Sequence, residues 1–385
     1  MVWMEQSTVS LRQEFVRLAT QDGANKRELC RRFGISPKTG YKWLERSRSD
    51  APAAQALADR SRRPLTSPAR SDAATEQRVV ALRHEHPAWG GRKIAHALLR
   101  QGHPRLAPST VTEILHRHAL ISREASEQAR PWQRFEHDAP NSLWQLDFKG
   151  HFATLAGRCH ALTLLDDHSR FNLLLSAMSR TDTAPVQAQL VQAFQRYGLP
   201  LRINADNGSP WGSPSAGGRS LSELAIWLIR LGVHVSFSAP YHPQTNGKLE
   251  RFHRSLNTEV LAGRHFKDHA GAQVDFDKWR PVYNFHRPHE ALQMHVPGDR
   301  YRHSAVPYPK RLRDIEYPGA DTVLTVGWNG FIRFQGHKLH TSSALHRLPI
   351  GIRPDPQHDG VHDVYFCHQR FMQIDLHALQ ADTQR

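Results

Sequence analysis

The spacing of apolar residues changes at residue 143, and this change most limits what the chain can fold into. Before it, apolar residues recur every three to four positions in short segments, which is the period of amphipathic helices. After it, LWQLDFK (143–149) alternates between apolar and polar side chains, as a strand does. A chain of 385 residues has room for two to four domains. We therefore expect a multidomain protein with all-α modules first and a sheet-containing part afterwards.

Residues 1–58 predict a helix-turn-helix module. Gly34 ends one short amphipathic helix, and Ser36 followed by proline is a typical start for the next. The second helix buries Tyr41 or Leu44, and two helices joined by such a turn resemble a DNA-reading unit. Its outward face carries a basic row, Lys38, Lys42 and Arg46, which are candidate DNA-binding residues.

A basic linker and a second helical module follow. Residues 59–71 are rich in arginine and proline and have no periodicity. Arg62 and Arg63 belong either to a plain spacer or to a segment that follows DNA phosphates or enters a minor groove. Residues 72–122 predict a second helix-turn-helix-like domain, and the polar residues 123–139 predict another linker.

The charge of the chain points to a polyanionic partner. The formal net charge is +15, the pI is near 10.2, and +11 of the surplus lies in the first 135 residues. No apolar stretch approaches about 18 residues, so we expect no membrane partner. The three widely separated cysteines exclude a disulfide framework and fit a reducing compartment. We expect a cytoplasmic protein that associates with the nucleoid through double-stranded DNA.

The remaining sequence predicts a catalytic α/β core and a small β domain. Over residues 140–302, strands and helices follow the order β-β-β-α-β-α-β-α, which favours a mixed sheet flanked by helices. Residues 320–378 are rich in short apolar runs and turns, and predict a five-stranded β-barrel.

Three carboxylates have positions that suggest chemistry. Asp147 lies on the first strand of the core, Asp206 follows the fourth, and Glu250 lies in the first turns of a helix. Taken singly, each has an ordinary interpretation as a strand-end, turn or solvated helix residue. In a sheet of this order, however, the first and fourth strands can be neighbours, so the three carboxylates can meet. Hard oxygen ligands of this kind suit two magnesium ions that activate a water or a 3′-hydroxyl.

Four motifs give the core a family resemblance. They are W-Q-L-D at 144–147, D-D-H-S-R at 166–170, D-N-G-S-P-W at 206–211 and H-P-Q-T-N-G-K-L-E-R-F-H at 242–253. Together they resemble the core signatures of DDE transposases and retroviral integrases, and more narrowly those of bacterial insertion-sequence transposases. The resemblance implies an RNase H-like fold, two Mg²⁺ or Mn²⁺ ions, and cleavage and strand transfer at terminal inverted repeats. The family's acidic triad then falls on Asp147, Asp206 and Glu250.

The helix that carries Glu250 has two faces. One face is apolar and is expected to bury against the sheet: Leu249, Phe252 and Leu256. Three cations flank the carboxylate and are candidates for phosphate contacts: Lys248, Arg251 and Arg254. His242, before the helix, either touches DNA or orders the entry turn.

The chain departs from the best-known members of that superfamily in one segment. Residues 207–222 add length between the second aspartate and the glutamate, and their Gly, Ser and Pro content predicts a mobile loop. Two other functions compete with an active transposase. A DNA-binding regulator without catalysis predicts a broken triad, whereas all three positions are acidic here. A nuclease that cuts without joining has little need of two DNA-reading modules. Since two element ends must meet a target, we expect at least a dimer on DNA.

Overall fold

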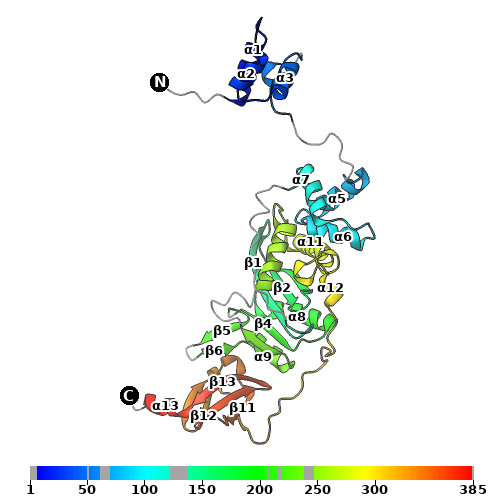
Figure 1. Ribbon diagram of the computed structural model, residues 1–385. Helices are drawn as coiled ribbons and strands as arrows, with labels where there is room; N and C mark the ends of the chain where they lie inside the picture. The colour runs from blue at the N-terminus through cyan, green and yellow to red at the C-terminus, as the bar shows by residue number, and fades with distance from the viewer. Residues whose placement is uncertain are drawn as a thin grey trace. The chain divides into compact units, whose positions relative to one another are not determined.

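The computed structural model describes residues 7–49, 52–60, 70–121, 137–206, 208–215, 218–237 and 247–383 (Figure 1). Arg62, Arg63 and His242 lie outside these ranges, as does most of the predicted linker 123–139. The chain divides into two compact units, Met1–Ser71 and Asp72–Arg385, which are described separately. Within the described ranges, none of the helices combines the length and the apolar character that crossing a bilayer requires.

The first unit is a small helical module. Its helices are α1 (Thr8–Ala19), α2 (Lys26–Arg32), α3 (Pro37–Arg46) and the single turn α4 (Ala53–Ala56). The Ser36 hydroxyl accepts a hydrogen bond from the Thr39 backbone and so caps α3, as its sequence predicts. Leu44 is buried at 8% exposure and Tyr41 is 54% exposed, so Leu44 is the buried one of these two candidates. On α1, Phe15 is 1% exposed, whereas Leu11 is 42% exposed.

The second unit begins with three further helices. They are α5 (Ala73–Glu85), α6 (Gly91–Arg100) and α7 (Pro108–Arg117). Their shared core contains Val79, Trp89, Ile94 and Ile114. A Cβ atom at Gly91 would lie 2.2 Å from the Thr112 hydroxyl, so α6 and α7 approach each other more closely than any other residue at position 91 would permit.

The second unit continues with an α/β core that contains a five-stranded mixed sheet. Its strands are β1 (Trp144–Thr154), β2 (Gly157–Asp166), β3 (Asn172–Met178), β4 (Arg202–Ala205) and β7 (His234–Phe237). Their order is β3-β2-β1-β4-β7. Strands β1 to β3 pair antiparallel, whereas β1 with β4 and β4 with β7 pair parallel. The predicted mixed sheet, with the first and fourth strands as neighbours, is confirmed.

Helices cover both faces of this sheet. The helical segments are α8 (Thr183–Tyr197), α9 (Glu223–Arg230), α10 (Gly247–Leu256), α11 (His269–Pro281), α12 (Pro297–Arg300) and two π-helical turns, Asn257–Leu261 and Val282–His286. Leu162 of β2 packs in one cluster with side chains of α8 and α9, whereas its neighbour Ala161 packs with α10 and α11. Successive strand residues point to opposite faces, so the two helix pairs lie on opposite sides. The apolar face predicted for α10 is buried, with Leu249, Phe252 and Leu256 at 1% exposure or less.

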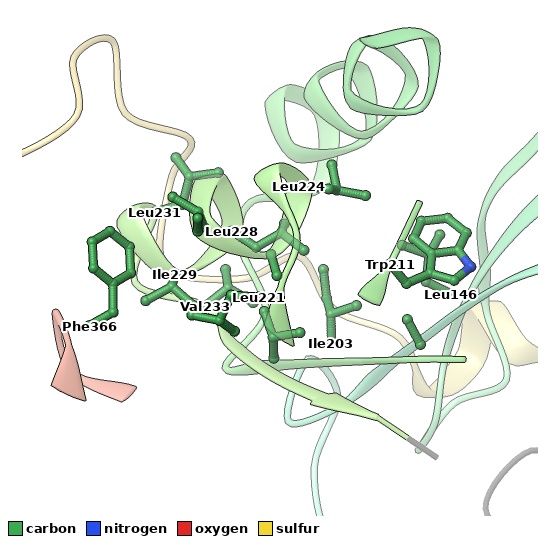
Figure 2. Close-up of a cluster of buried hydrophobic side chains, with 14 of the residues drawn as sticks. Leu146, Ile203, Trp211, Leu221, Leu224, Leu228, Ile229, Leu231, Val233 and Phe366 are labelled. Carbon is green, nitrogen blue, oxygen red and sulfur yellow. The ribbon is translucent and has the colours of Figure 1, made fainter. Parts of the chain in front are cut away.

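The segment predicted as a mobile loop, residues 207–222, contains a β-hairpin. Its strands are β5 (Gly212–Ser215) and β6 (Gly218–Leu221), which pair antiparallel. Trp211 and Leu221 at its two ends are each only 4% exposed. Figure 2 shows Trp211 beside Leu146 of β1, and Leu221 among the apolar side chains of α9 and its neighbouring strands. Burial at both ends therefore ties this Gly- and Ser-rich segment to the core.

The C-terminal domain consists of two open sheets, so the predicted closed barrel is wrong. Strands β8 (Thr322–Thr325), β11 (Pro349–Pro354), β12 (Val361–Phe366) and β13 (Gln369–Asp375) form an antiparallel sheet, β9 (Phe331–Phe334) and β10 (His337–His340) form a hairpin, and α13 (Leu376–Thr383) follows. No closing pair joins these sheets among residues 320–378, all of which are described. Phe366 instead packs toward Ile229 and Leu231 of the core (Figure 2), so the apolar face of this domain is buried without closure.

The edge of the core sheet is also contacted by this domain. The side-chain amide of Gln369 donates to the Val235 carbonyl at 2.8 Å and accepts from the Val235 backbone amide at 2.8 Å. Ser342 donates a hydrogen bond to the Leu221 carbonyl at 2.7 Å. These contacts attach the C-terminal domain to β7 and to the hairpin.

Candidate active site

The register of β1 and β4, two adjacent inner strands of the sheet, brings two carboxylates together. The parallel pairs Trp144–Ile203 and Gln145–Asn204 each join residues 59 positions apart. Asp147 and Asp206 are separated by the same 59 positions, just beyond the last pair. Because parallel strands keep their register, Asp147, in the first half of β1, comes beside Asp206, which directly follows the end of β4.

Asp147 is mostly buried and lies close to two like charges. Burial, together with the charges of the neighbouring Asp206 and Glu250, raises the pKa of its carboxyl to about 7. A hydrogen bond from the Phe148 backbone amide opposes this shift. The structure thus brings Asp147, Asp206 and Glu250 near enough for their charges to interact, although they come from two strands and a helix.

The three carboxylates are the donors that could hold a divalent cation. The described part of the chain contains no group of three or more His, Cys, Asp and Glu side chains already spaced around an ion. The chemistry of the set nevertheless fits a cation, because three hard oxygen donors repel one another and shift the pKa of the buried one upward. A positive ion between them would remove that repulsion.

The cations on α10 divide into two kinds. Arg251 and Arg254 are exposed beside Glu250, which is itself exposed. The Lys248 side chain is only 12% exposed and forms an ion pair with Asp167. Arg251 and Arg254 are therefore accessible to a phosphate, whereas the ammonium of Lys248 is occupied by a carboxylate.

On α3 of the first unit, the predicted basic row is partly exposed. Lys38 and Lys42 are exposed and Arg46 is half-buried. Lys42 and Arg46 lie over the ring of Trp43, at 4.6 Å and 4.9 Å from its centroid. Trp43 is 5% exposed, so a buried indole holds the charged ends of two of the three cations.

Four residues near the carboxylates were not identified from the sequence. They are Gln145, Thr163, Asp167 and His253; Asp167 and Thr163 contact Lys248 and His253 of α10, and they are also hydrogen-bonded to Gln145 and to the Asp147 carbonyl of β1. The signal available was the pair of aspartates at the end of β2 together with a lysine two positions before Glu250. Their meeting depends on the packing of α10 against the sheet, which the sequence motifs do not specify.

Comparison with known families covers most of the chain. A helix-turn-helix domain matches residues 11–64, a homeodomain-like domain residues 39–115, integrase core domains residues 137–243 and 231–297, and the C-terminal domain of IS481 family transposases residues 321–382. The chain thus has helix-turn-helix domains followed by an integrase core, in the order in which its structural parts occur.

Individual relatives come from insertion sequences and retroviruses. The 39.2 kDa protein of insertion element IS476 from Xanthomonas euvesicatoria is 26% identical over 59% of this chain and 64% of its own length, just under two thirds. The transposase for insertion sequence element IS904 of Lactococcus lactis is 26% identical over 58% of this chain and 91% of its own length. The HTLV-2 integrase catalytic core, solved in complex with magnesium, has a TM-score of 0.33 and 16% identity, and covers 43% of this chain and 100% of its own.

Proposed function

We propose that this chain, a bacterial insertion-sequence transposase with an integrase-type core, cleaves DNA and joins it to a target through Asp147, Asp206 and Glu250. The observation that supports the proposal is the meeting of three carboxylates: Asp147 on β1 lies beside Asp206 after β4, and the charges of Asp206 and Glu250 both act on Asp147. Like charges this close to one another cost stability, and such clusters are typical of sites that bind a cation or carry out chemistry.

The carboxylates would hold two Mg²⁺ or Mn²⁺ ions. When bound, such ions supply an activated water or 3′-hydroxyl and stabilise the leaving oxygen of the phosphodiester. The exposed guanidinium groups of Arg251 and Arg254 would bind phosphates beside Glu250 and fix the scissile strand. No protein side chain then needs to form a covalent bond to DNA.

Recognition of the element ends would belong to the helix-turn-helix domains. On α3 the exposed Lys38 and Lys42, together with Arg46, present cations at helical spacing to terminal inverted repeats. Strand transfer needs two ends and a target duplex, so the working form on DNA would be at least a dimer. All three acidic positions are retained, which disfavours a regulator without catalysis.

A strand-transfer assay with labelled element ends tests this function. Asp147→Asn, Asp206→Asn and Glu250→Gln should each lower cleavage and joining by on the order of a thousandfold or more, and the losses should not add. End binding, measured by gel shift, should stay near that of the wild type. Asp182→Asn, which alters an exposed aspartate that pairs with Arg180, is the matched control and should leave joining unchanged. Full joining by any one of the three variants, or a protein–DNA adduct that survives denaturation, would overturn the proposal.

A further inference from the structure

The D-D-H-S-R segment at residues 166–170 has no part in the reaction proposed above, yet its two aspartates are buried. Asp166 shapes its own turn: its carboxylate accepts hydrogen bonds from the backbone amides of Ser169 and Asn141, both at 2.7 Å. Asp167 points elsewhere and has partners far away in the sequence. The two adjacent carboxylates therefore have different roles.

Asp167 connects the strand of Asp147 to the helix of Glu250. Its side chain is 3% exposed and forms an ion pair with Lys248, which also donates to the Asp167 carbonyl at 3.1 Å. The Asp167 carboxylate also accepts hydrogen bonds from the side-chain amide of Gln145 and from the backbone amide of His137, both at 3.0 Å. Gln145 precedes Asp147 on β1 by two residues, and Lys248 precedes Glu250 on α10 by two residues. One buried carboxylate thus holds the positions just before two of the three acidic residues.

A second connection lies one turn further along α10. The Thr163 hydroxyl donates to the Asp147 carbonyl at 2.9 Å and lies 2.8 Å from Nε2 of His253. The single hydroxyl proton is used on the carbonyl, so Nε2 of His253 must donate to the Thr163 oxygen. Burial lowers the pKa of His253 to about 4, which keeps the ring neutral at physiological pH. His253 follows Glu250 by three residues, so Glu250 is flanked by a contact to the sheet on each side.

Glu250 does not itself hold α10 in place against the sheet, because its side chain is exposed. Leu249 and Phe252 fix the face of α10 that packs on the sheet, but apolar contacts tolerate sliding along the helix axis. A buried ion pair and a directed hydrogen bond do not tolerate it, because both have defined partners. The register of Glu250 relative to Asp147 therefore depends on polar contacts.

We propose that Asp167 and Lys248 are positioning residues, whose buried ion pair sets Glu250 against Asp147 so that the carboxylates can share a metal ion. This inference rests on the proposed function. It also gives Lys248 a role different from the phosphate contact expected from its sequence position. Residues that do not touch a metal but form hydrogen bonds around its ligands keep those ligands oriented, and their loss typically weakens metal binding about 10- to 100-fold.

The test measures Mn²⁺ binding to the metal-free full-length protein without DNA, from the electron paramagnetic resonance signal of free Mn²⁺. Asp167→Asn, Lys248→Met and the double variant should each raise the Mn²⁺ concentration at half-saturation about 10- to 100-fold. Arg287→Met breaks the buried pair with Glu259, at the far end of α10, and is the matched control. It should lower the melting temperature and leave half-saturation unchanged. A lost phosphate contact would not alter Mn²⁺ binding in the absence of DNA.

The outcomes separate the two proposals. Unchanged half-saturation in Asp167→Asn, Lys248→Met and the double variant, with Asp147→Asn and Glu250→Gln abolishing binding, overturns the positioning role alone. Unchanged Mn²⁺ binding in Asp147→Asn and Glu250→Gln overturns the proposed function itself. If Asp167→Asn does not fold, the double variant carries the same test, because it leaves no uncompensated buried charge.

Discussion

Two sets of charged side chains lie at opposite ends of α10, and they differ in how their charges are balanced. Beyond the C-terminal end, Glu259 and Arg287 are 7% and 8% exposed and join at 2.8 Å. Trp279 donates to the same carboxylate at 2.8 Å, so the buried charge is fully matched. Near the N-terminal end, Asp147 has Asp206 and Glu250 as its electrostatic neighbours, and its pKa rises to about 7.

The two sets of charges thus have opposite effects on stability: the paired charges stabilise the folded state, and the like charges destabilise it. A matched buried pair stabilises the native state once it is formed, because either partner alone would be a desolvated charge. Like charges near one another lower stability and are the arrangement expected where a cation or a reaction will later compensate them. Helix α10 therefore has a stabilising ion pair beyond its C-terminal end and the candidate active site near its N-terminal end.

The largest effect on the free energy of unfolding is expected from breaking the matched pair. Arg287→Met leaves the Glu259 carboxylate buried with Trp279 but without its cation, and should cost about 3–5 kcal/mol. Urea unfolding followed by tryptophan fluorescence measures the change. Arg254→Met, on the exposed face of α10, is the control and should change stability by less than about 0.5 kcal/mol. Equal urea midpoints for Arg287→Met and Arg254→Met would show that the buried pair contributes no more to stability than an exposed charge on α10.

Near the N-terminal end of α10, removing a charge is expected to raise the free energy of unfolding instead of lowering it. Asp147→Asn should stabilise the metal-free protein at pH 8, by at most about 4 kcal/mol. The folded-state pKa of Asp147 lies above its ordinary value, so the wild type loses stability as pH rises from about 4 to about 7 and levels off above that. The advantage of the variant should therefore vanish near pH 4.

Melting temperatures in EDTA between pH 4 and pH 8 test this sign. The lowered pKa of His253 also makes stability depend on pH, in the opposite direction, but His253 is present in both proteins and cancels in the difference. A difference in melting temperature between wild type and variant that does not change with pH would show that the charge of Asp147 does not destabilise the folded state.

A smaller effect should follow from adding a cation. Mn²⁺ at a hundredfold excess over its dissociation constant should stabilise the wild type by about 2.7 kcal/mol. Asp147→Asn should lose most of this gain, because the cation would then relieve less repulsion. The measurement is the shift in melting temperature with Mn²⁺ at pH 8. An equal shift in both proteins would place the bound ion elsewhere.

The smallest effect on folding is expected from charges that are exposed. Changing Lys38, Lys42 and Arg46 to Ala should cost about 1 kcal/mol or less of stability, mainly through lost contact with Trp43. The same change should flatten the slope of log affinity against log salt for element ends by about 2.7, the value for three phosphate contacts. Fluorescence anisotropy at several salt concentrations measures both affinity and slope. An unchanged affinity would remove α3 from the DNA interface.

Periodicity along the chain accounts for the parts that could be predicted. Alternation and helical spacing were sufficient to predict the mixed sheet, the neighbouring first and fourth strands, and the buried face of α10 through Leu249, Phe252 and Leu256. Both kinds of pattern record which side of an element meets a core. By the same logic they place Asp147 on the first strand of the core and Asp206 directly after the fourth.

Features that depend on distant partners were not predicted. The ion pair of Asp167 and Lys248 joins residues 81 positions apart, and a charged residue in a sequence does not reveal whether it is buried. The barrel prediction was wrong because strand patterns do not specify where an apolar face is covered, and Phe366 is covered by the core. The composition of residues 207–222 predicted a loop, but burial of Trp211 and Leu221 holds a hairpin there.

The contact between Gln369 and Val235 has a consequence for solubility. Strand β7 is the last strand of the core sheet, and an open edge of this kind is a template on which strands of other molecules can add. The primary amide of Gln369 satisfies both the donor and the acceptor of one edge residue, as a neighbouring peptide group would. The C-terminal domain therefore covers this edge of the core sheet and should limit its pairing with strands of other molecules. A core produced without it would expose both this edge and the apolar surface around Ile229 to uncontrolled self-association.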